Sequence, residues 1–317
     1  MSSGIDYTTT ALLDNTRTNC LTPEADALFT NTRLLAMLSF EQITTLVPQI
    51  MKVQEEYFVH VYDILLSTST DGTYPIPDRA VGKKLRDVCL LDSAGNEQYM
   101  TRMNPADVKF MNPSVTAQTQ WVSGFYLQNN SVKLFSGIPA QYTSIRYRYY
   151  RRPNNLVAIG DAAQITLIDT GTNTVTCSSV PGDWVVTDTV DFISQHPSFD
   201  SLRDDAAITV INNSDVTFAS LPTGLEVGDW ISLSGTTPLP QLPYEAHPVL
   251  GQLGACKALE AMGDANVEMA WARYKQMSAD FYTSITPRTD SPAQKIVSPN
   301  SISNRGYLGL GRGWGWR

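Results

Sequence analysis

Apolar positions recur every three or four residues in two separate parts of the chain, which is the spacing of an amphipathic helix. In residues 22–66 the pattern predicts two or three helices, one of which runs from 48 to 66. Within this part, Ser39-Phe40-Glu41-Gln42 matches an S-x-x-Q capping box and predicts a helix start at Ser39. Residues 244–285 carry the second helical pattern and predict two more helices.

Between these helical parts the pattern changes to that of β-strands. Residues 125–127 and 132–135 are apolar runs that flank a polar turn, and this arrangement predicts a hairpin. Residues 143–150 predict a further strand, and the whole of 74–157 is expected to be a β region. The first twenty residues are polar and unpatterned, so we expect residues 1–21 to form an ordered arm or a loose terminus.

Residues 158–240 are rich in Thr, Ser, Val, Asp and Gly, and they contain an internal echo. Ile165–Asp169 resembles Ile208–Asn212, and Gly182-Asp183-Trp184 resembles Gly228-Asp229-Trp230. The two offsets are 43 (208 − 165) and 46 (228 − 182), so the second copy carries extra loop residues. Two tandem β units that pack as one small barrel or sandwich are therefore expected.

These patterns together predict an α+β fold. The N- and C-terminal helices are expected to form a helical bundle, accompanied by the β region and by an inserted two-unit all-β domain. The predicted parts are an N-terminal arm (1–21), a core made of 22–157 and 241–285, the inserted β domain (158–240) and a C-terminal tail (286–317).

Charge and composition narrow the function classes. The 23 Lys and Arg against 31 Asp and Glu give a net charge of −8, which argues against a protein whose main task is to grip nucleic acid. It remains compatible with a wall past which DNA slides. Neither a signal peptide nor a membrane-spanning run is expected from the apolar pattern. The four cysteines show no CxxC spacing and are expected to be buried free thiols in a reducing compartment.

The candidates for catalysis are few. The three histidines are isolated in sequence; His60 falls in the predicted 48–66 helix, and His247 precedes a proline at a predicted helix start, where packing or capping is the usual role. Adjacent carboxylates occur at Glu55-Glu56 and Asp204-Asp205, but a glycosidase needs two carboxyls that face each other across a cleft. We expect no catalytic, cofactor or metal site, and a glycan-acting enzyme stays open as an alternative.

A basic, aromatic segment precedes Pro153 and carries the main candidate contact strand. Arg146 and Arg148 share one face of the predicted strand, and Arg151 and Arg152 follow them. One interpretation is an inter-subunit or DNA-facing strand that meets phosphates or an acidic partner. The interpretation we favour is a half-buried strand whose arginines meet carboxylates of a neighbouring element, because the whole chain is acidic.

Tryptophan residues raise the same choice between binding and packing. Trp184 and Trp230 of the two Gly-Asp-Trp elements could stack on sugars, but anchoring a small core is the more common role. The C-terminal tail is different, because glycines separate apolar and aromatic residues that are costly to leave in water. Docking into a groove on a partner explains it better than a tolerated frayed end. The proposed docking residues are Tyr307, Leu308, Leu310, Arg312, Trp314, Trp316 and Arg317.

The order of several short motifs resembles the head-to-tail adaptor (connector) proteins of the tailed-bacteriophage neck. Each motif is weak alone, and the resemblance covers roughly 25–157 and 244–285. The residues that carry it are Tyr74–Asp78, Leu85–Val88, Asp92–Gly95, Phe125–Phe135, Tyr149–Val157 and Ala258–Asp264.

The resemblance implies a non-enzymatic subunit of a ring, twelvefold in that family, which extends the DNA channel from portal to tail. It implies that a helical bundle builds the ring, that the β region reaches a downstream tail or nozzle protein, and that the C-terminal tail docks on the portal protein. Contact with phage DNA would be transient and non-specific, with no membrane partner. The chain would be made in the host bacterial cytoplasm and reside in the virion neck.

Residues 158–240 depart from the simple adaptor pattern. An alternative function is therefore a virion surface or tail β protein that binds carbohydrate or tail fibres through this segment.

Overall fold

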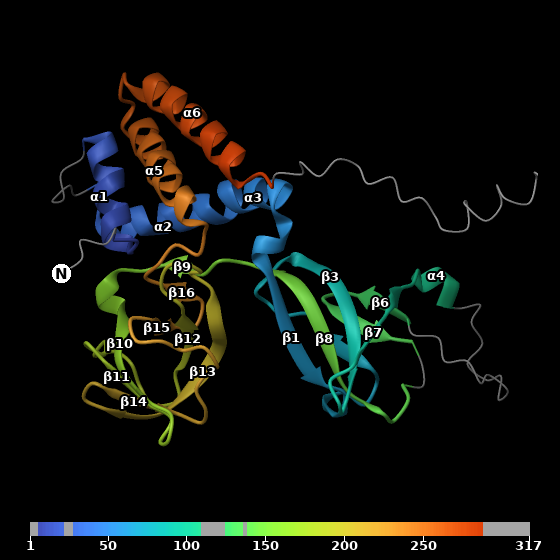
Figure 1. Ribbon diagram of the computed structural model, residues 1–317. Helices are drawn as coiled ribbons and strands as arrows, with labels where there is room; N and C mark the ends of the chain where they lie inside the picture. The colour runs from blue at the N-terminus through green and yellow to red at the C-terminus, as the bar shows by residue number, and fades with distance from the viewer. Residues whose placement is uncertain (1–5, 22–27, 109–123, 136–137, 288–317) are drawn as a thin grey trace, which may run out of the picture. The chain divides into compact units, whose positions relative to one another are not determined.

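The computed structural model describes residues 6–21, 28–108, 124–135 and 138–287 (Figure 1). The chain divides into two units, Met1–Ile285 and Thr286–Arg317. The first unit is mixed α+β, as the sequence predicts. The sequence predicted boundaries between an arm, a core and an inserted β domain. These boundaries stay predictions, because residues 1–285 form one unit that is not divided further.

Helices α1, α2, α3, α5 and α6 share one hydrophobic core, but the regular helical bundle expected from the sequence is not evident. Instead, α5 is buried along most of its length and contacts α1, α2 and α6, so these three helices pack around it (Figure 1). The helices are α1 (Thr9–Cys20), α2 (Asn31–Glu41), α3 (Val47–Val53), α4 (Pro105–Val108), α5 (His247–Met262) and α6 (Val267–Ile285), and a π-helical turn (Gln42–Leu46) joins α2 to α3.

Small residues on α5 let its neighbours approach closely. A Cβ atom on Gly254 would lie 2.5 Å from Leu38 Cδ2 of α2 and 3.2 Å from Thr16 Cγ2 of α1. Glycine is therefore required at this crossing for steric reasons, although it lowers intrinsic helix propensity.

Two predictions for the N-terminal part are wrong. The expected arm contains α1, whose buried Leu12 and Leu13 belong to the helical core. The capping box at Ser39 is not a helix start, because α2 runs through it. The buried Ser39 hydroxyl donates to the Leu35 carbonyl (2.7 Å) and accepts from the Leu156 N–H (2.8 Å). Serine thus returns a bond to its own helix while holding a second segment.

The helix predicted over 48–66 is also wrong beyond Val53. After a 3₁₀ turn at Glu55–Phe58, the chain forms strand β1 (Val59–Leu65), which pairs antiparallel with β8 over seven residues. The spacing of its apolar residues fits a helix, but β-branched residues and a long neighbouring strand favour sheet pairing. His60 consequently lies on a strand.

The β region predicted over 74–157 forms two four-stranded sheets with orders β1-β8-β3-β4 and β2-β7-β6-β5, which share a hydrophobic core. The predicted hairpin is confirmed as β6–β7, and the predicted strand at 143–150 is confirmed as β8. The strands are β2 (Thr73–Pro75), β3 (Ala80–Asp92), β4 (Glu97–Tyr99), β5 (Thr101–Arg102), β6 (Gly124–Gln128), β7 (Ser131–Leu134) and β8 (Tyr142–Arg151).

The following segment forms a closed six-stranded barrel, which decides between the barrel and the sandwich. Its circular order is β10-β11-β14-β13-β12-β15. Exchanging β10 with β13, β11 with β14 and β12 with β15 leaves every pair of neighbours unchanged, so the barrel has an internal pseudo-twofold axis. Its strands are β10 (Ala162–Asp169), β11 (Thr174–Cys177), β12 (Thr189–Ile193), β13 (Ser201–Asn212), β14 (Asp215–Phe218) and β15 (Trp230–Leu233), and a small parallel pair is formed by β9 (Asn155–Leu156) and β16 (Thr236–Thr237).

Of the two sequence similarities within the barrel, that of Ile165–Asp169 to Ile208–Asn212 joins structurally equivalent residues, whereas that of the two Gly-Asp-Trp segments does not. Ile165 donates its N–H to the carbonyl of Asp229 (2.8 Å), and Ile208 donates to the carbonyl of Asp188 (2.9 Å). These bonds make Ile165 equivalent to Ile208 and Asp229 equivalent to Asp188. The aspartate in Gly182–Trp184 therefore does not take the place of Asp229, and this part of the predicted repeat is wrong.

The equivalent turns share a backbone requirement rather than a motif. Thr187 (φ 88°) and Gly228 (φ 104°) precede the two aspartates and both have left-handed backbones. Each carboxylate, of Asp188 and of Asp229, accepts a hydrogen bond from the amide three residues before it (2.9 and 2.8 Å). Glycine satisfies this conformation easily, whereas threonine is strained in it, so residue identity alone conceals the repeat.

Candidate functional site

A charged network joins the first β-sheet to the barrel. Arg79, which precedes β3, pairs with Asp191 of β12 and with Asp204 and Asp205 of β13. Arg151, at the end of β8, pairs with Asp204 at 2.7 Å. We call this set of two arginines and three aspartates the sheet–barrel joint.

Asp191 is the centre of the joint. Its side chain is fully buried and accepts hydrogen bonds from Arg79 Nη2 (2.9 Å) and Asn154 Nδ2 (2.7 Å). It also accepts from the backbone amides of Asp205 (3.0 Å) and Gly235 (2.9 Å). Several donors from distant segments thus surround one carboxylate, which is the condition under which a buried charge is tolerated.

Asp204 supports the same connection from β13. Burial alone would raise the pKa of its carboxyl group, but the hydrogen bond and charge of Arg151, together with the charge of Arg79, lower that pKa to about 2. The carboxylate therefore stays ionised across the physiological pH range, and the joint keeps its charge pairs.

We expect the contribution of Asp204 to the joint to be lost in acid only below the ordinary aspartate range. A carboxyl group with a lowered folded-state pKa adds stability above its unfolded pKa of about 4 and loses that contribution as pH falls toward 2. Urea unfolding at several pH values between 5 and 2 measures this loss. In the Asp204→Asn variant the stability lost over that interval should be smaller than in the natural chain, and an equal loss would contradict the assignment.

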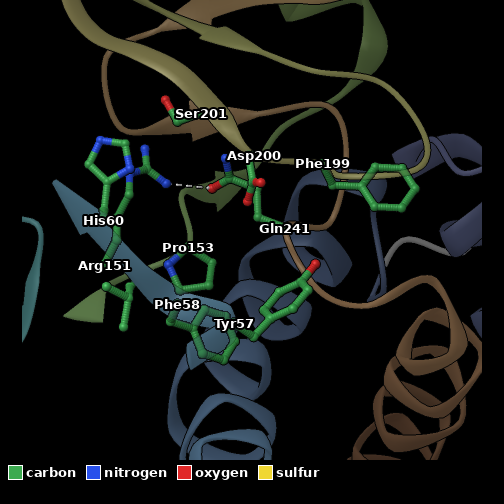
Figure 2. Close-up of a pocket in the computed structure, with 10 residues that line it drawn as sticks. Tyr57, Phe58, His60, Arg151, Pro153, Phe199, Asp200, Ser201 and Gln241 are labelled. Atoms are coloured by element: carbon green, nitrogen blue, oxygen red, sulfur yellow. Dashed lines mark hydrogen bonds between the residues drawn. The ribbon is translucent and has the colours of Figure 1, made fainter. Parts of the chain in front are cut away.

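A small cavity lies beside the joint (Figure 2). Its volume of about 30 Å³ is that of roughly one water molecule. Arg151 lines it and donates to Gln241 Oε1 at 3.1 Å, the bond drawn in Figure 2. Its other lining residues are Tyr57, Phe58, Val59, His60, Pro153, Phe199, Asp200 and Ser201.

The cavity is suited to holding the chain together rather than to transforming a substrate. Burial lowers the pKa of His60 and raises the pKa of the Tyr57 hydroxyl, so at neutral pH the imidazole is uncharged and the phenol keeps its proton. Arg151 is committed to Asp204 and Gln241. A space for one water leaves no room for a sugar or nucleotide beside these groups.

The arginines predicted on the strand before Pro153 meet carboxylates. Arg146 binds Asp63 through two bonds of 2.7 Å and Glu97 at 2.8 Å. Arg148 binds Glu97 at 2.7 Å and Asp87 at 3.0 Å. The interpretation we favoured, pairing with a neighbouring element, is confirmed for these two residues.

The remaining two arginines behave differently. Arg151 is buried within the sheet–barrel joint, whereas the Arg152 side chain is exposed. An inter-subunit or DNA-facing role for the four arginines stays a prediction. The seven predicted portal-docking residues of the C-terminal tail, 307–317, lie outside the described residues.

Several packing predictions are confirmed. Trp184 and Trp230 are buried in hydrophobic clusters, so they anchor cores and present no stacking platform. His247 is buried at the start of α5, with Nε2 3.1 Å from the Pro240 carbonyl oxygen. All four cysteines are buried free thiols.

The helical part carries apolar grooves that open to solvent. One of about 620 Å³ lies between α2 and residues 155–158, bordered by Phe40, whose side chain is 64% exposed. Another of about 550 Å³ lies where α1, α5 and α6 meet, bordered by Leu21 and Met269. A third, of about 430 Å³, lies between α1 and the start of α5. Sequence reasoning did not single out Phe40 as an exposed groove residue, although it falls outside the stripe of Leu34, Leu35 and Leu38.

Among the described residues, no group of three or more His, Cys, Asp and Glu side chains could hold a metal ion. Within the same part of the chain, Asn31–Val53 is the one helical stretch long and apolar enough to cross a membrane, and half of it is buried inside the fold. Core helices meet the same criteria, so this stretch is weak evidence for a membrane span.

Comparison with known protein families and with curated proteins finds no match.

Proposed function

We propose that this protein is a structural subunit of a bacteriophage neck, which assembles into a ring, joins the portal to the tail and lines the DNA exit channel. The ordered set of motifs in 25–157 and 244–285 supports the family, and the following properties support the role. In this proposal the N- and C-terminal helices that pack around α5 build the ring, and the subunit has no enzymatic activity.

The observation that carries the proposal is the exposed apolar surface that the described residues of the helical part present. Phe40 is 64% exposed beside a groove of about 620 Å³, and Leu21 and Met269 border a second groove. Monomers rarely leave large apolar side chains exposed around grooves, whereas neighbours in an oligomer cover them. The grooves lie on different helices, so they suit a contact in which one surface of a subunit meets a different surface of its neighbour. Such head-to-tail contacts generate rings when the rotation between neighbours closes.

The sheet–barrel joint supports the same role. A ring subunit that transmits force between a capsid and a tail requires its parts to keep a fixed arrangement, and buried charge pairs impose a defined geometry. In the proposed particle, the β part faces a downstream tail or nozzle protein, and the tail residues 307–317 dock on the portal. The expected oligomer is a dodecamer, located in the virion neck after synthesis in the host cytoplasm.

The charge distribution fits a channel wall. The chain carries a net charge of −8, and Arg146 and Arg148 are neutralised by carboxylates. Contact with passing phage DNA would therefore be transient and non-specific, since tight binding needs basic groups free to pair with phosphates. No membrane partner is proposed.

The test is assembly on the portal protein of the same phage. We expect the full chain to form a ring on the portal in negative-stain images, and a chain ending at Pro287 to lose it. Phe40→Ser should reduce ring formation about ten-fold through loss of an apolar anchor. The matched control is Leu167→Ser on the barrel, whose side chain is 61% exposed and should leave assembly unchanged.

The melting temperatures of both serine variants should match that of the natural chain, because each side chain faces solvent. Rings that form equally with Phe40→Ser would show that the α2 groove is not the contact. Absence of any ring from the full chain would contradict the proposal and favour the surface or tail β protein instead. A glycan array on the full chain would then test that alternative.

A further inference from the structure

Strand β1 forms an open edge of the first sheet. It lies at the end of the order β1-β8-β3-β4 and pairs with β8 along all seven residues, Val59–Leu65. No strand of the described residues pairs with its other side. The main-chain groups on that side are therefore available to another extended segment.

The other edges in the described chain are short, closed or charged. The opposite edge of the same sheet, β4, has three residues, and the edges of the second sheet, β2 and β5, have three and two. Strand β4 covers only Cys89–Leu91 of β3, and the stretch of β3 that it leaves unpaired carries Lys83, Lys84 and Arg86. The barrel is closed and has no edge. Proteins usually shorten, cover or charge edges to prevent unwanted pairing, so an open seven-residue edge without Lys or Arg is the exception among the described strands.

The side chains of β1 give little protection against pairing. Val61 is 45% exposed, and Tyr62 and Leu65 are also largely exposed. The one acidic residue on the strand, Asp63, is held by Arg146 through two hydrogen bonds of 2.7 Å. A charged side chain on an edge strand normally opposes pairing with another strand, but Arg146 already neutralises the charge of Asp63.

We propose that β1 accepts an extended, uncharged segment of a different protein, which pairs with it as an added strand. Main-chain hydrogen bonds would supply the affinity, and apolar residues at alternate positions would contact Val61 and Leu65 on one face and Tyr62 on the other. Neutralisation of Asp63 favours a segment without charge at these positions. In the proposed phage neck, this different protein is the downstream tail component, and that identification rests on the proposed function.

A second copy of this chain is a poorer donor. Among the described residues, the long unpaired strand sides are β1 itself and the outer side of β3 before Cys89. Pairing of β1 with the β1 of another copy relates the two chains by a twofold axis, and it therefore closes a dimer rather than a ring. The unpaired stretch of β3 carries Lys83, Lys84 and Arg86, and charged side chains on an edge oppose pairing, so it is a poorer match for β1 than an uncharged segment of another protein.

The test is site-specific photo-crosslinking in full-length chain produced during phage infection. A benzophenone amino acid replaces Val61 in one variant and Val210 in the other. Val210 is a matched control, because it is 50% exposed on strand β13 of the closed barrel. We expect the adduct yield at position 61 to exceed that at 210 about ten-fold, with the adduct mapped to one short apolar segment of a single partner.

A second measurement tests the strand geometry directly. Hydrogen–deuterium exchange compares the full chain alone with the complex formed by that partner. We expect amide exchange across 59–65 to slow about ten-fold in the complex, since added-strand pairing protects edge amides. The Val61→Lys variant should lose this protection and keep its melting temperature, because a lysine at an edge opposes pairing without disturbing the core.

The outcomes separate this inference from the proposed function. Equal adducts at 61 and 210, an adduct that joins two β1 strands, or unprotected amides in the complex would each overturn the edge-strand proposal, even if rings form on the portal. An adduct to one segment of a protein outside the virion, with protected amides, would support the added strand and contradict the neck function.

Discussion

Replacing Asp191 with alanine should lower the free energy of unfolding by about 3–5 kcal/mol, the range measured when one partner of a buried ion pair is removed. The side chain is fully buried and accepts from Arg79, from Asn154 and from two backbone amides. Its loss leaves the backbone amides of Asp205 and Gly235 without this acceptor and removes the one fully buried carboxylate that faces Arg79, in a place that water does not easily reach. Urea unfolding followed by circular dichroism measures the change.

The matched control is Asp205→Ala, on the exposed rim of the same joint. The Asp205 carboxylate also pairs with Arg79, at 2.7 Å, but its side chain is 57% exposed. Exposed pairs contribute about 0–1 kcal/mol, because water replaces the lost partner. Equal destabilisation by the two substitutions would show that the barrel is not anchored by the buried carboxylate, and would remove the rigidity argument for the proposed role.

Local patterns in the sequence explain why much of the β region was predictable. Turn residues bracket the β6–β7 hairpin, and alternating side chains mark β8, so both elements follow from short-range rules. Strand β1 was missed because its apolar spacing also fits a helix, and only pairing with β8, about eighty residues away, decides its conformation.

The joint could not be predicted for the same reason. Arg79 and Asp191 are 112 residues apart, and neither residue carries a local signal of its partner. The adjacent carboxylates Asp204-Asp205 were noticed in the sequence, but as possible catalytic groups. Only the fold shows that they meet arginines from the sheet. Ion pairs between residues far apart in the sequence change neither the local composition nor the spacing of apolar residues. Such pairs are therefore found only in the folded structure.

The barrel shows how a repeat can be correct while its motif is wrong. Ile165 and Ile208 are equivalent by their backbone bonds, yet the second Gly-Asp-Trp corresponds to Thr187-Asp188-Thr189 rather than to Gly182–Trp184. Both turns have a left-handed residue and a carboxylate that accepts a hydrogen bond from a backbone amide, so what they share is the backbone geometry. The tryptophans were therefore not placed by symmetry, and each has its own packing environment.

Substitutions of Trp184 distinguish a residue that anchors the barrel core from one that stacks on bound sugars. Trp184→Ala should lower the free energy of unfolding by about 3–5 kcal/mol, because the buried indole fills the barrel core. Trp184→Phe should cost less than about 1.5 kcal/mol, since the indole Nε1 makes no hydrogen bond to any described residue and an aromatic ring remains. Thermal and urea unfolding of the full-length variants measure both changes.

A glycan array with the same proteins reads out the alternative function. A stacking platform would lose sugar binding in Trp184→Ala while the free energy of unfolding stayed within about 1 kcal/mol of the natural chain, since removing an exposed ring leaves the core intact. Large destabilisation by alanine together with near-neutral replacement by phenylalanine would instead assign Trp184 to the barrel core. A carbohydrate-binding role for residues 158–240 would then need a different surface, because the two residues best suited to stacking are enclosed by their own clusters.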